Sequence, residues 1–208
     1  MKDIGKGFNR IAGIYDGLAR LVFGTKLKHA KAYFLQDMLA CQQLLILGGG
    51  SGELLDMLSE KGFTGQITYL EGSDKMIQLA QGRQLETLRI QWLQQDALQW
   101  EGIANTFDGI CCCFFLDIFS EHERAHLLDR CQTVLRGPGK FLLVDFHNEA
   151  QYRWLIRLMY TFFRLVSGIS GNRLPQWEHL ISGHGFRLVK QKYTASGLLL
   201  SQLYELIG

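Results

Sequence analysis

Residues 44–55 read LLILGGGSGELL, so that Gly48, Gly50 and Gly52 follow a short apolar run. An apolar run that ends in glycine is typical of a buried parallel strand and the turn after it. In an open parallel sheet, a glycine-rich first turn brings backbone amides and a helix N-terminus close to a bound ligand. This spacing predicts a ligand site, and the alternative is that the glycines serve only a tight turn.

Two acidic residues stand at the ends of the next two expected strands. Glu71 follows the run at 66–70, and Asp96 follows the run at 89–94. A carboxylate in the first position can accept hydrogen bonds from both hydroxyls of a ribose, and one in the second position can accept from an amine such as that of adenine. The alternatives are a solvated loop acid for Glu71 and a helix N-cap for Asp96.

The glycine spacing argues against a diphosphate ligand. The dinucleotide pattern GxGxxG needs a small residue where this chain has Glu53, and no Gly-Lys-Ser/Thr follows as in a P-loop. A carboxylate so close to a diphosphate would repel it. We therefore expect a nucleoside ligand without phosphates.

Apolar runs and helical patterns alternate along the chain, which predicts an α/β fold with a doubly wound, mostly parallel Rossmann-like sheet. Helices are expected over 7–22 and 26–40, and strands over 44–47, 66–70, 89–94, 107–115, 140–146, 185–193 and 198–206. Ser120 and Glu123 form a capping-box pattern at one helix start, and Gly137-Pro138-Gly139 is expected to end that helix. A turn at Ser196-Gly197 predicts that the last two of the seven strands form an antiparallel hairpin.

These segments resemble the class I S-adenosylmethionine-dependent methyltransferases over most of the chain. ILGGGSGELL is similar to the first motif of that family, LEGSDKMIQLA to its acidic second motif, and QQDAL to its Asp-Ala motif on the adenine side. The opening FNRIAGIYDGLARLVFG resembles the N-terminal helix of the subgroup that contains the quinone-biosynthesis C-methyltransferases, in which a Tyr-Asp pair lies near the cofactor. The resemblance implies S-adenosylmethionine as cofactor, bound by Tyr15, Gly48, Gly50, Gly52, Glu71, Gly72, Met76, Asp96, Ala97 and Phe114.

The chain departs from the family pattern in two places. Ile46 stands where the family usually has an acid that helps to orient the glycine turn and the methionine ammonium group, which implies weaker cofactor binding or a substitute. The Asn/Asp-Pro-Pro-Tyr motif of planar-nitrogen methylation is absent, and Phe114-Phe115-Leu116-Asp117 stands there instead. Together with a formal net charge of only +2, this argues against nucleic acid as a partner.

Methyl transfer from a sulfonium mainly needs two aligned reactants with water excluded, so we expect neither a protein nucleophile nor a metal. A general base helps only if the acceptor is a phenol or an acidic carbon. The candidates at the carboxyl edge of the sheet are His147, which we favour as the catalytic residue, Asp117 and Tyr15. The alternative for His147 is a solvent-facing or capping loop histidine.

Two segments are expected to cover the acceptor site: the N-terminal helices within 1–40 and a helical insertion over 150–183. The insertion is apolar and aromatic, with Arg153, Arg157 and Arg164 on one stripe. In the subgroup that this chain resembles, such segments tend to cover the acceptor pocket. We therefore expect Trp154, Tyr160 and Asp117 to contact the acceptor. A membrane-surface contact and an ordinary core helix are the alternatives.

The sequence therefore predicts one domain over 1–208 that methylates a small lipophilic or aromatic acceptor at carbon or oxygen. Five cysteines without a CxxC pair, and an opening interrupted by charges, predict free thiols and a cytoplasmic protein without a signal peptide. The alternative functions are a non-catalytic S-adenosylmethionine-binding scaffold and a nicotinamide-dependent reductase, against which Glu53 argues.

Overall fold

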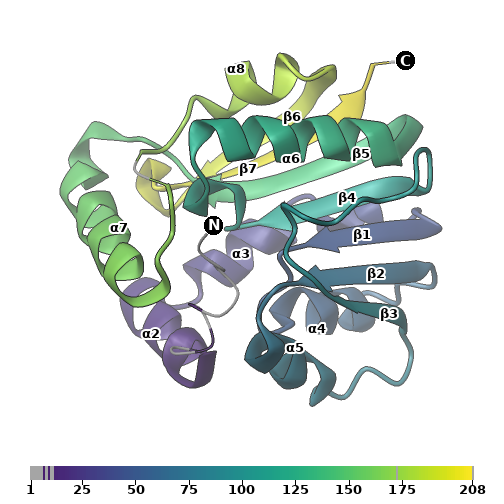
Figure 1. Ribbon diagram of the computed structural model, residues 1–208, viewed down its shortest axis with the longest axis horizontal. Coiled ribbons are helices and arrows are strands. Elements are labelled where there is room, and N and C mark those ends of the chain that lie inside the picture. The colour runs from purple at the N-terminus through teal and green to yellow at the C-terminus, as the bar shows by residue number, and fades with distance from the viewer. Residues whose placement is uncertain (1–6, 8, 10–11, 172, 208) are drawn as a thin grey trace.

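A seven-stranded sheet with the order β3-β2-β1-β4-β5-β7-β6 forms the centre of the computed structural model, which describes residues 7, 9, 12–171 and 173–207 (Figure 1). The strands are β1 (Gln43–Leu47), β2 (Gln66–Glu71), β3 (Arg89–Gln94), β4 (Phe107–Cys113), β5 (Leu135–Phe146), β6 (Phe186–Thr194) and β7 (Leu199–Leu206). The first five are parallel to one another, and β7 runs antiparallel to both β5 and β6. The predicted Rossmann-like sheet with its C-terminal hairpin is confirmed.

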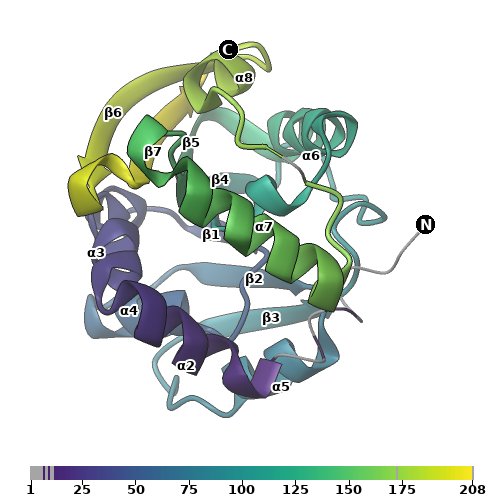
Figure 2. The same cartoon turned by 90° about the vertical axis from the view of Figure 1, so that its left-hand side faces the viewer.

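Helices cover both faces of the sheet and the edge where the parallel strands end. They are α2 (Ala12–Phe23), α3 (Lys26–Ala32), α4 (Glu53–Glu60), α5 (Asp74–Gln81), α6 (Glu121–Val134), α7 (Arg153–Ser167) and α8 (Trp177–Ser182), with 3-10 turns η1 (Leu35–Met38), η2 (Leu116–Ile118), η3 (Ala150–Tyr152) and η4 (Ala195–Gly197). In Figure 1, α3 and α4 lie behind the sheet and α6 lies in front of it. Figure 2 shows α2 and α7 in front of the strand ends, where they can cover a site.

The core is centred on β1, which lies between β2 and β4. Its residues Leu44, Leu45, Ile46 and Leu47 are at most 2% exposed. Because helices cover both faces of the sheet, side chains of both orientations must be apolar, which is why this strand reads as a continuous apolar run. The cysteines of β4 continue this core, and burial raises the pKa of the Cys111 thiol well above its ordinary value.

Two element boundaries within the described ranges differ from the predictions by five residues or more, whereas strand ends such as that of β4 at Cys113 differ by one or two. The helix expected over 26–40 ends at Ala32, because Phe34 leaves the helical region with φ −113° and ψ 15° before η1 begins. The strand expected at 140–146 begins at Leu135, directly after α6, since Leu135 already pairs with Phe107. Gly137-Pro138-Gly139 therefore lies inside β5, where the register with β4 shifts, and does not end the helix.

The start of α6 shows the predicted capping box. The Ser120 hydroxyl accepts a hydrogen bond from the Glu123 backbone amide at 3.4 Å, and the Glu123 carboxylate accepts one from the Ser120 amide at 2.8 Å. These bonds satisfy backbone donors that have no partner within the helix. The box therefore fixes where α6 begins, immediately after η2, whose residues face the site described below.

Substitution Ser120→Ala removes one half of this box, and we expect it to lower the free energy of unfolding by about 1 kcal/mol. Thr133→Ala is the matched control, because the exposed Thr133 lies on the same helix and its hydroxyl donates to the Asp129 carbonyl, away from the capping box. Urea titration followed by circular dichroism measures both variants. Equal midpoints for Ser120→Ala and the wild type would contradict a stabilising role for the box.

Candidate functional site

The glycine turn connects β1 to α4. Gly48, Gly50 and Gly52 have φ values of 68°, 64° and 90°, a backbone region that residues other than glycine rarely adopt. A Cβ atom on Gly48 would also collide with the ring of Phe115. Bare backbone is therefore required here both by conformation and by space.

Glu71, at the end of β2, holds this turn in place. Its Oε2 accepts a hydrogen bond from the Gly50 amide at 2.8 Å, and its Oε1 accepts one from the Ser73 amide at 2.8 Å. Burial raises the pKa of Glu71, while the backbone amides of Ser73, Gly50 and Gly72 act in the opposite direction. Each carboxylate oxygen retains a second lone pair, so Glu71 can also accept from ligand hydroxyls.

Ile46 does not take part in the site. It is 2% exposed, and its neighbours across the sheet are Tyr69 and Cys111. The turn is held from the next strand instead, because the Tyr69 hydroxyl donates to the Gly50 carbonyl at 2.8 Å. Tyr69 and Glu71 together therefore supply the orientation of the loop for which the family commonly uses an acid at the position of Ile46.

A cavity of about 520 Å³, called here the cofactor cavity, opens beside the glycine turn. Its walls include eight of the predicted cofactor residues: Gly48, Gly50, Glu71, Gly72, Met76, Asp96, Ala97 and Phe114. Asp96 also supports its own turn, since its Oδ1 accepts from the Leu98 amide at 3.0 Å. The chemistry of these walls, with acids at two strand ends and open backbone between them, fits a nucleoside.

The other two predicted cofactor residues lie elsewhere. Gly52 does not line the cavity but forms the N-cap of α4, where an added Cβ would lie 2.9 Å from the Cβ of Ala80 on α5. Its smallness therefore serves helix packing. The side chain of Tyr15, on α2, lies outside the described residues.

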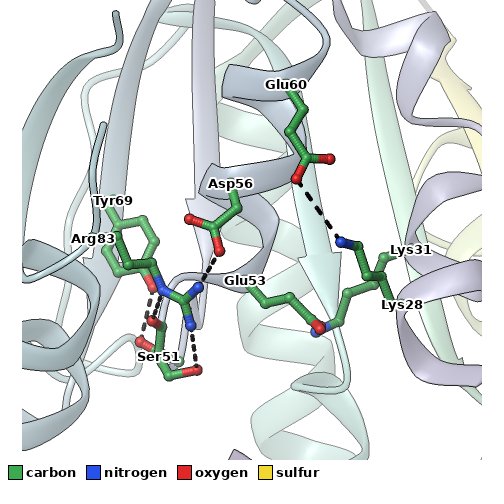
Figure 3. Close-up of polar contacts among 9 residues, drawn as sticks. Lys28, Lys31, Ser51, Glu53, Asp56, Glu60, Tyr69 and Arg83 are labelled. Atoms are coloured by element: carbon green, nitrogen blue, oxygen red, sulfur yellow. Dashed lines mark hydrogen bonds and ion pairs between the residues drawn. The ribbon is translucent and has the colours of Figure 1, made fainter. Parts of the chain in front are cut away.

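Lys31 and Arg83, which sequence patterns did not single out, also line the cofactor cavity and are labelled in Figure 3. Lys31 of α3 places its Nζ 2.7 Å from Oε2 of Glu53, the first residue of α4. Arg83 donates its Nε to the Ser51 carbonyl at 2.5 Å and pairs with Asp56. These contacts join segments far apart in the sequence, which is why no local motif indicates them.

A second cavity, of about 320 Å³ and called here the acceptor cavity, lies between α2, α7 and η2. It is lined by Val22, Phe23, Leu27, Phe114, Asp117, Ile118, Phe146, Leu155, Ile156, Leu158, Met159, Tyr160, Phe162, Phe163, Ile169 and Leu174. Leu27, Phe114 and Ile118 line both cavities. The two cavities therefore adjoin at the end of β4.

Phe114 forms the wall between the cavities. Its φ of 52° is unusual for an aromatic residue, and its amide donates to the Val144 carbonyl at 2.7 Å. Its ring lies 5.2 Å from that of Phe146, and Lys31 Nζ lies 5.7 Å from its centre. Strained backbone held in this way is common where a side chain must meet a ligand.

The three residues expected to contact the acceptor are placed differently. Tyr160 is 6% exposed and lines the acceptor cavity, where its hydroxyl donates to the Asp117 carbonyl at 3.3 Å. Burial raises the pKa of Tyr160 well above its ordinary value, so the phenol stays protonated. Asp117 also lines this cavity, but Trp154 is 68% exposed and does not, because its side chain faces away on α7.

His147 is not in a position to act as the catalytic base. It lines neither cavity; its Nδ1 lies 3.1 Å from the Gly197 carbonyl, and its ring lies 4.7 Å from that of Tyr193. The backbone after β5 runs toward the hairpin turn η4, because the His147 amide donates to the Leu198 carbonyl. The prediction for His147 is therefore corrected to a contact within the C-terminal hairpin.

Within the described ranges, no group of three or more His, Cys, Asp or Glu side chains is arranged to hold a metal ion. No helix in that same part of the chain is both long and apolar enough to cross a membrane. Exposed apolar side chains do flank the acceptor cavity, among them Leu21 on α2 and Trp154 and Leu165 on α7. Peripheral membrane contact stays a prediction.

Comparison with known proteins agrees with this geometry. A family model described as "Methyltransferase domain" matches residues 44–139. A demethylmenaquinone methyltransferase of Thermotoga maritima is 29% identical over 179 residues, which cover 83% of this chain and 76% of that protein. One of Thermus thermophilus is 28% identical over 67% of this chain and 64% of its own length.

Among solved structures, the fold is similar to the methyltransferase component of a Haloferax volcanii complex with the Trm112 methyltransferase activator. The TM-score is 0.74 at 15% identity, with 97% of this chain and 98% of that chain covered. At such low identity the similarity concerns the fold alone.

Substitution Glu71→Gln tests the anchoring role of the carboxylate. Gln places an amide nitrogen where one oxygen must accept, so we expect the dissociation constant of S-adenosylhomocysteine to rise about tenfold or more. Calorimetric titration measures it, with Glu86→Gln as control because Glu86 is exposed and lies outside the cavity. Unchanged affinity in Glu71→Gln would exclude this carboxylate from ligand binding.

Proposed function

We propose that this chain, a class I S-adenosylmethionine-dependent methyltransferase of the quinone-methyltransferase-like type, methylates a small lipophilic or aromatic acceptor at carbon or oxygen. One observation carries the proposal: an apolar cavity adjoins the cofactor cavity and shares the walls Leu27, Phe114 and Ile118 with it. A flat or elongated apolar molecule fits such a cavity, since its walls offer almost only hydrocarbon and aromatic surface.

The names of the relatives support the same class of acceptor. Two proteins of nearly 30% identity are called demethylmenaquinone methyltransferases, a name that denotes a lipophilic quinone-type acceptor. For the present chain we propose the broader class of small aromatic or lipophilic acceptors.

The ribose and adenine ends of the cofactor are assigned to the acids at the strand ends. We propose that Glu71 accepts from the ribose hydroxyls and that Asp96 and Ala97 face the adenine, with Met76 against the ring. Bound S-adenosylmethionine supplies a methyl group activated by a sulfonium. The residues that line the cofactor cavity would hold it, and we place Phe114, which lines both cavities, near the reacting centre.

We propose that the Lys31–Glu53 pair holds the amino-acid end of the cofactor. An ammonium and a carboxylate on the ligand can each find an opposite charge in this pair, whose atoms lie 2.7 Å apart on the cavity wall. Glu53 then supplies a carboxylate that Ile46 cannot. The pair is partly buried, with side chains 16% and 37% exposed, so solvent weakens the interaction less than at an open surface.

The chain accelerates the transfer by alignment and exclusion of water. Phe114, Ile118 and Leu27 close the junction of the cavities with apolar atoms, and α2 and α7 cover the strand ends (Figure 2). Such surroundings hold two reactants at short distance in a dry volume, which supplies most of what an in-line displacement needs. The second cavity at this junction favours turnover over a non-catalytic scaffold. The Glu53 carboxylate on the wall of the cofactor cavity disfavours a nicotinamide dinucleotide, because it would repel the diphosphate.

Substitution Lys31→Met tests the assignment of the amino-acid end. We expect it to weaken binding of S-adenosylhomocysteine about tenfold, because a charged hydrogen bond is lost. Binding of methylthioadenosine, which lacks the amino acid, should stay unchanged. Lys28→Met is the control, since Lys28 also lines the cavity but is half exposed and pairs distantly with Glu60. Equal weakening of both ligands would contradict the assignment.

Methyl release from labelled S-adenosylmethionine, measured over pools of quinols, phenols and fatty acids, tests the function itself. We expect turnover with an aromatic pool, and substitution Met159→Gln should raise KM for it about tenfold, because an amide is buried in an apolar cavity. Leu165→Gln lies on the same helix but is 79% exposed, and it should not change KM. Tight binding of S-adenosylhomocysteine without turnover on any pool would favour a scaffold.

A further inference from the structure

Asp117 brings a carboxyl group to an otherwise apolar cavity. Apart from the phenol of Tyr160, the other side chains in the acceptor-cavity wall given above are hydrocarbon, aromatic or thioether. Asp117 is 7% exposed, and its Oδ1 has no hydrogen-bond partner among the described residues. Native proteins rarely leave a buried acceptor atom without a donor, because its lost hydration is not replaced. Asp117 therefore places an enclosed acceptor atom without a donor in the wall of the acceptor cavity.

A second carboxyl and one guanidinium lie behind it. Asp145, near the end of β5, is fully buried; its Oδ1 accepts from the Phe146 amide at 2.7 Å, and its Oδ2 has no partner in the described part of the chain. Arg124 of α6 is 2% exposed and donates through Nη1 to the Arg173 carbonyl at 3.4 Å. Neither Asp145 nor Arg124 lines the acceptor cavity. We call Asp117, Asp145 and Arg124 the acid cluster.

The acid cluster holds one positive charge and two acids, so two ionised carboxylates would leave an unbalanced negative charge in a dry place. Burial is the largest influence on both acids. It raises the pKa of Asp117 to about 7, against the opposing charge of Arg124. Burial and the charge of Asp117 also raise the pKa of Asp145. Of the two acids only Asp117 lines the acceptor cavity, so Asp117 is the carboxyl that a ligand there can meet.

We propose that Asp117 is the residue that accepts the proton of an aromatic hydroxyl on the methyl acceptor, with Arg124 as the positioning residue that sets its charge. This inference rests on the proposed function and narrows its acceptor to aromatic molecules that carry a hydroxyl. Ethers and ketones of the same shape offer no proton to Asp117. Around Asp117 the titratable and charged groups are Arg124 from α6, Tyr160 from α7 and Asp145 from β5.

The proton and electrons balance in this step. The acceptor O–H bond breaks, its proton moves to the Asp117 carboxylate, and its electron pair stays on the acceptor oxygen. That oxygen, or a ring carbon conjugated with it, forms the new bond to the methyl group while the methyl–sulfur bond breaks and leaves its pair on sulfur. For attack by carbon, the displaced ring proton restores the hydroxyl. In both cases the sulfonium and the carboxylate lose their charges together.

A pair of matched compounds tests the inference without knowledge of the natural acceptor. Binding of 1-naphthol and of 1-methoxynaphthalene to the protein saturated with S-adenosylhomocysteine is measured by calorimetry from about pH 5.5 to 8.5. We expect naphthol to bind about tenfold more tightly above about pH 7, where Asp117 is ionised, and the preference to shrink below it. Asp117→Asn should remove the preference and its pH dependence while methoxynaphthalene binds as before.

Substitutions of Arg124 test the inference through the direction in which the pH dependence shifts. Since its charge lowers the pKa of Asp117, Arg124→Met should move the onset of the naphthol preference to higher pH, and Arg124→Lys should leave it nearer the wild-type value. If the preference for naphthol persists in Asp117→Asn, or if that variant binds neither compound, the role of Asp117 is overturned and the proposed function still stands. If neither compound binds the wild type although S-adenosylhomocysteine does, the aromatic acceptor of the proposed function fails as well.

Discussion

The carboxylate of Glu71 joins the turn after β1 to the turn after β2, and the cofactor cavity depends on this link. A glycine turn has no side chains with which to fix itself, so its amides need a partner from a neighbouring element. Glu71 provides it through the Gly50 and Ser73 amides, and the Tyr69 hydroxyl holds the Gly50 carbonyl. The same bonds oppose the effect of burial on the pKa of Glu71. The amide bonds that shape the turn thus also favour the charged form of the carboxylate against the effect of burial.

The two cavities offer opposite environments on either side of Phe114. The cofactor cavity contains paired charges, such as Lys31 with Glu53, which suit a ligand that carries charges of both signs. The acceptor cavity is apolar, and α2 and α7 form most of it. A polar ligand therefore binds more favourably in the cofactor cavity and an apolar ligand in the acceptor cavity, and the two meet at the shared wall. This division is the physical basis for expecting transfer between two different molecules.

Local patterns were sufficient for much of the fold and of the cofactor cavity. Buried strands, the capping box at Ser120 and the glycine turn are each encoded by a few adjacent residues, and the parallel order then brings Glu71 and Asp96 to one edge. His147 was misplaced because its direction depends on β7, a strand more than fifty residues later that pairs beside β5. Lys31, Arg83 and Asp145 were missed for a related reason: their partners come from other elements, and no spacing in the sequence records those contacts.

The acid cluster resolves a problem that a dry methyl-transfer site creates. When a sulfonium gives up its methyl group, a positive charge disappears from the cofactor side, and the proton released by a hydroxyl acceptor must be received nearby. An isolated carboxylate in an apolar cavity would be too costly to keep ionised, and an isolated guanidinium would be equally unfavourable once that carboxylate was protonated. Arg124 supplies a positive charge that acts on both acids, since it lowers the pKa of Asp117 and of Asp145 against the effect of burial. The lipophilic character of the acceptor cavity and the presence of a buried acid in its wall are therefore compatible, because the charge is balanced behind the wall and not within the cavity.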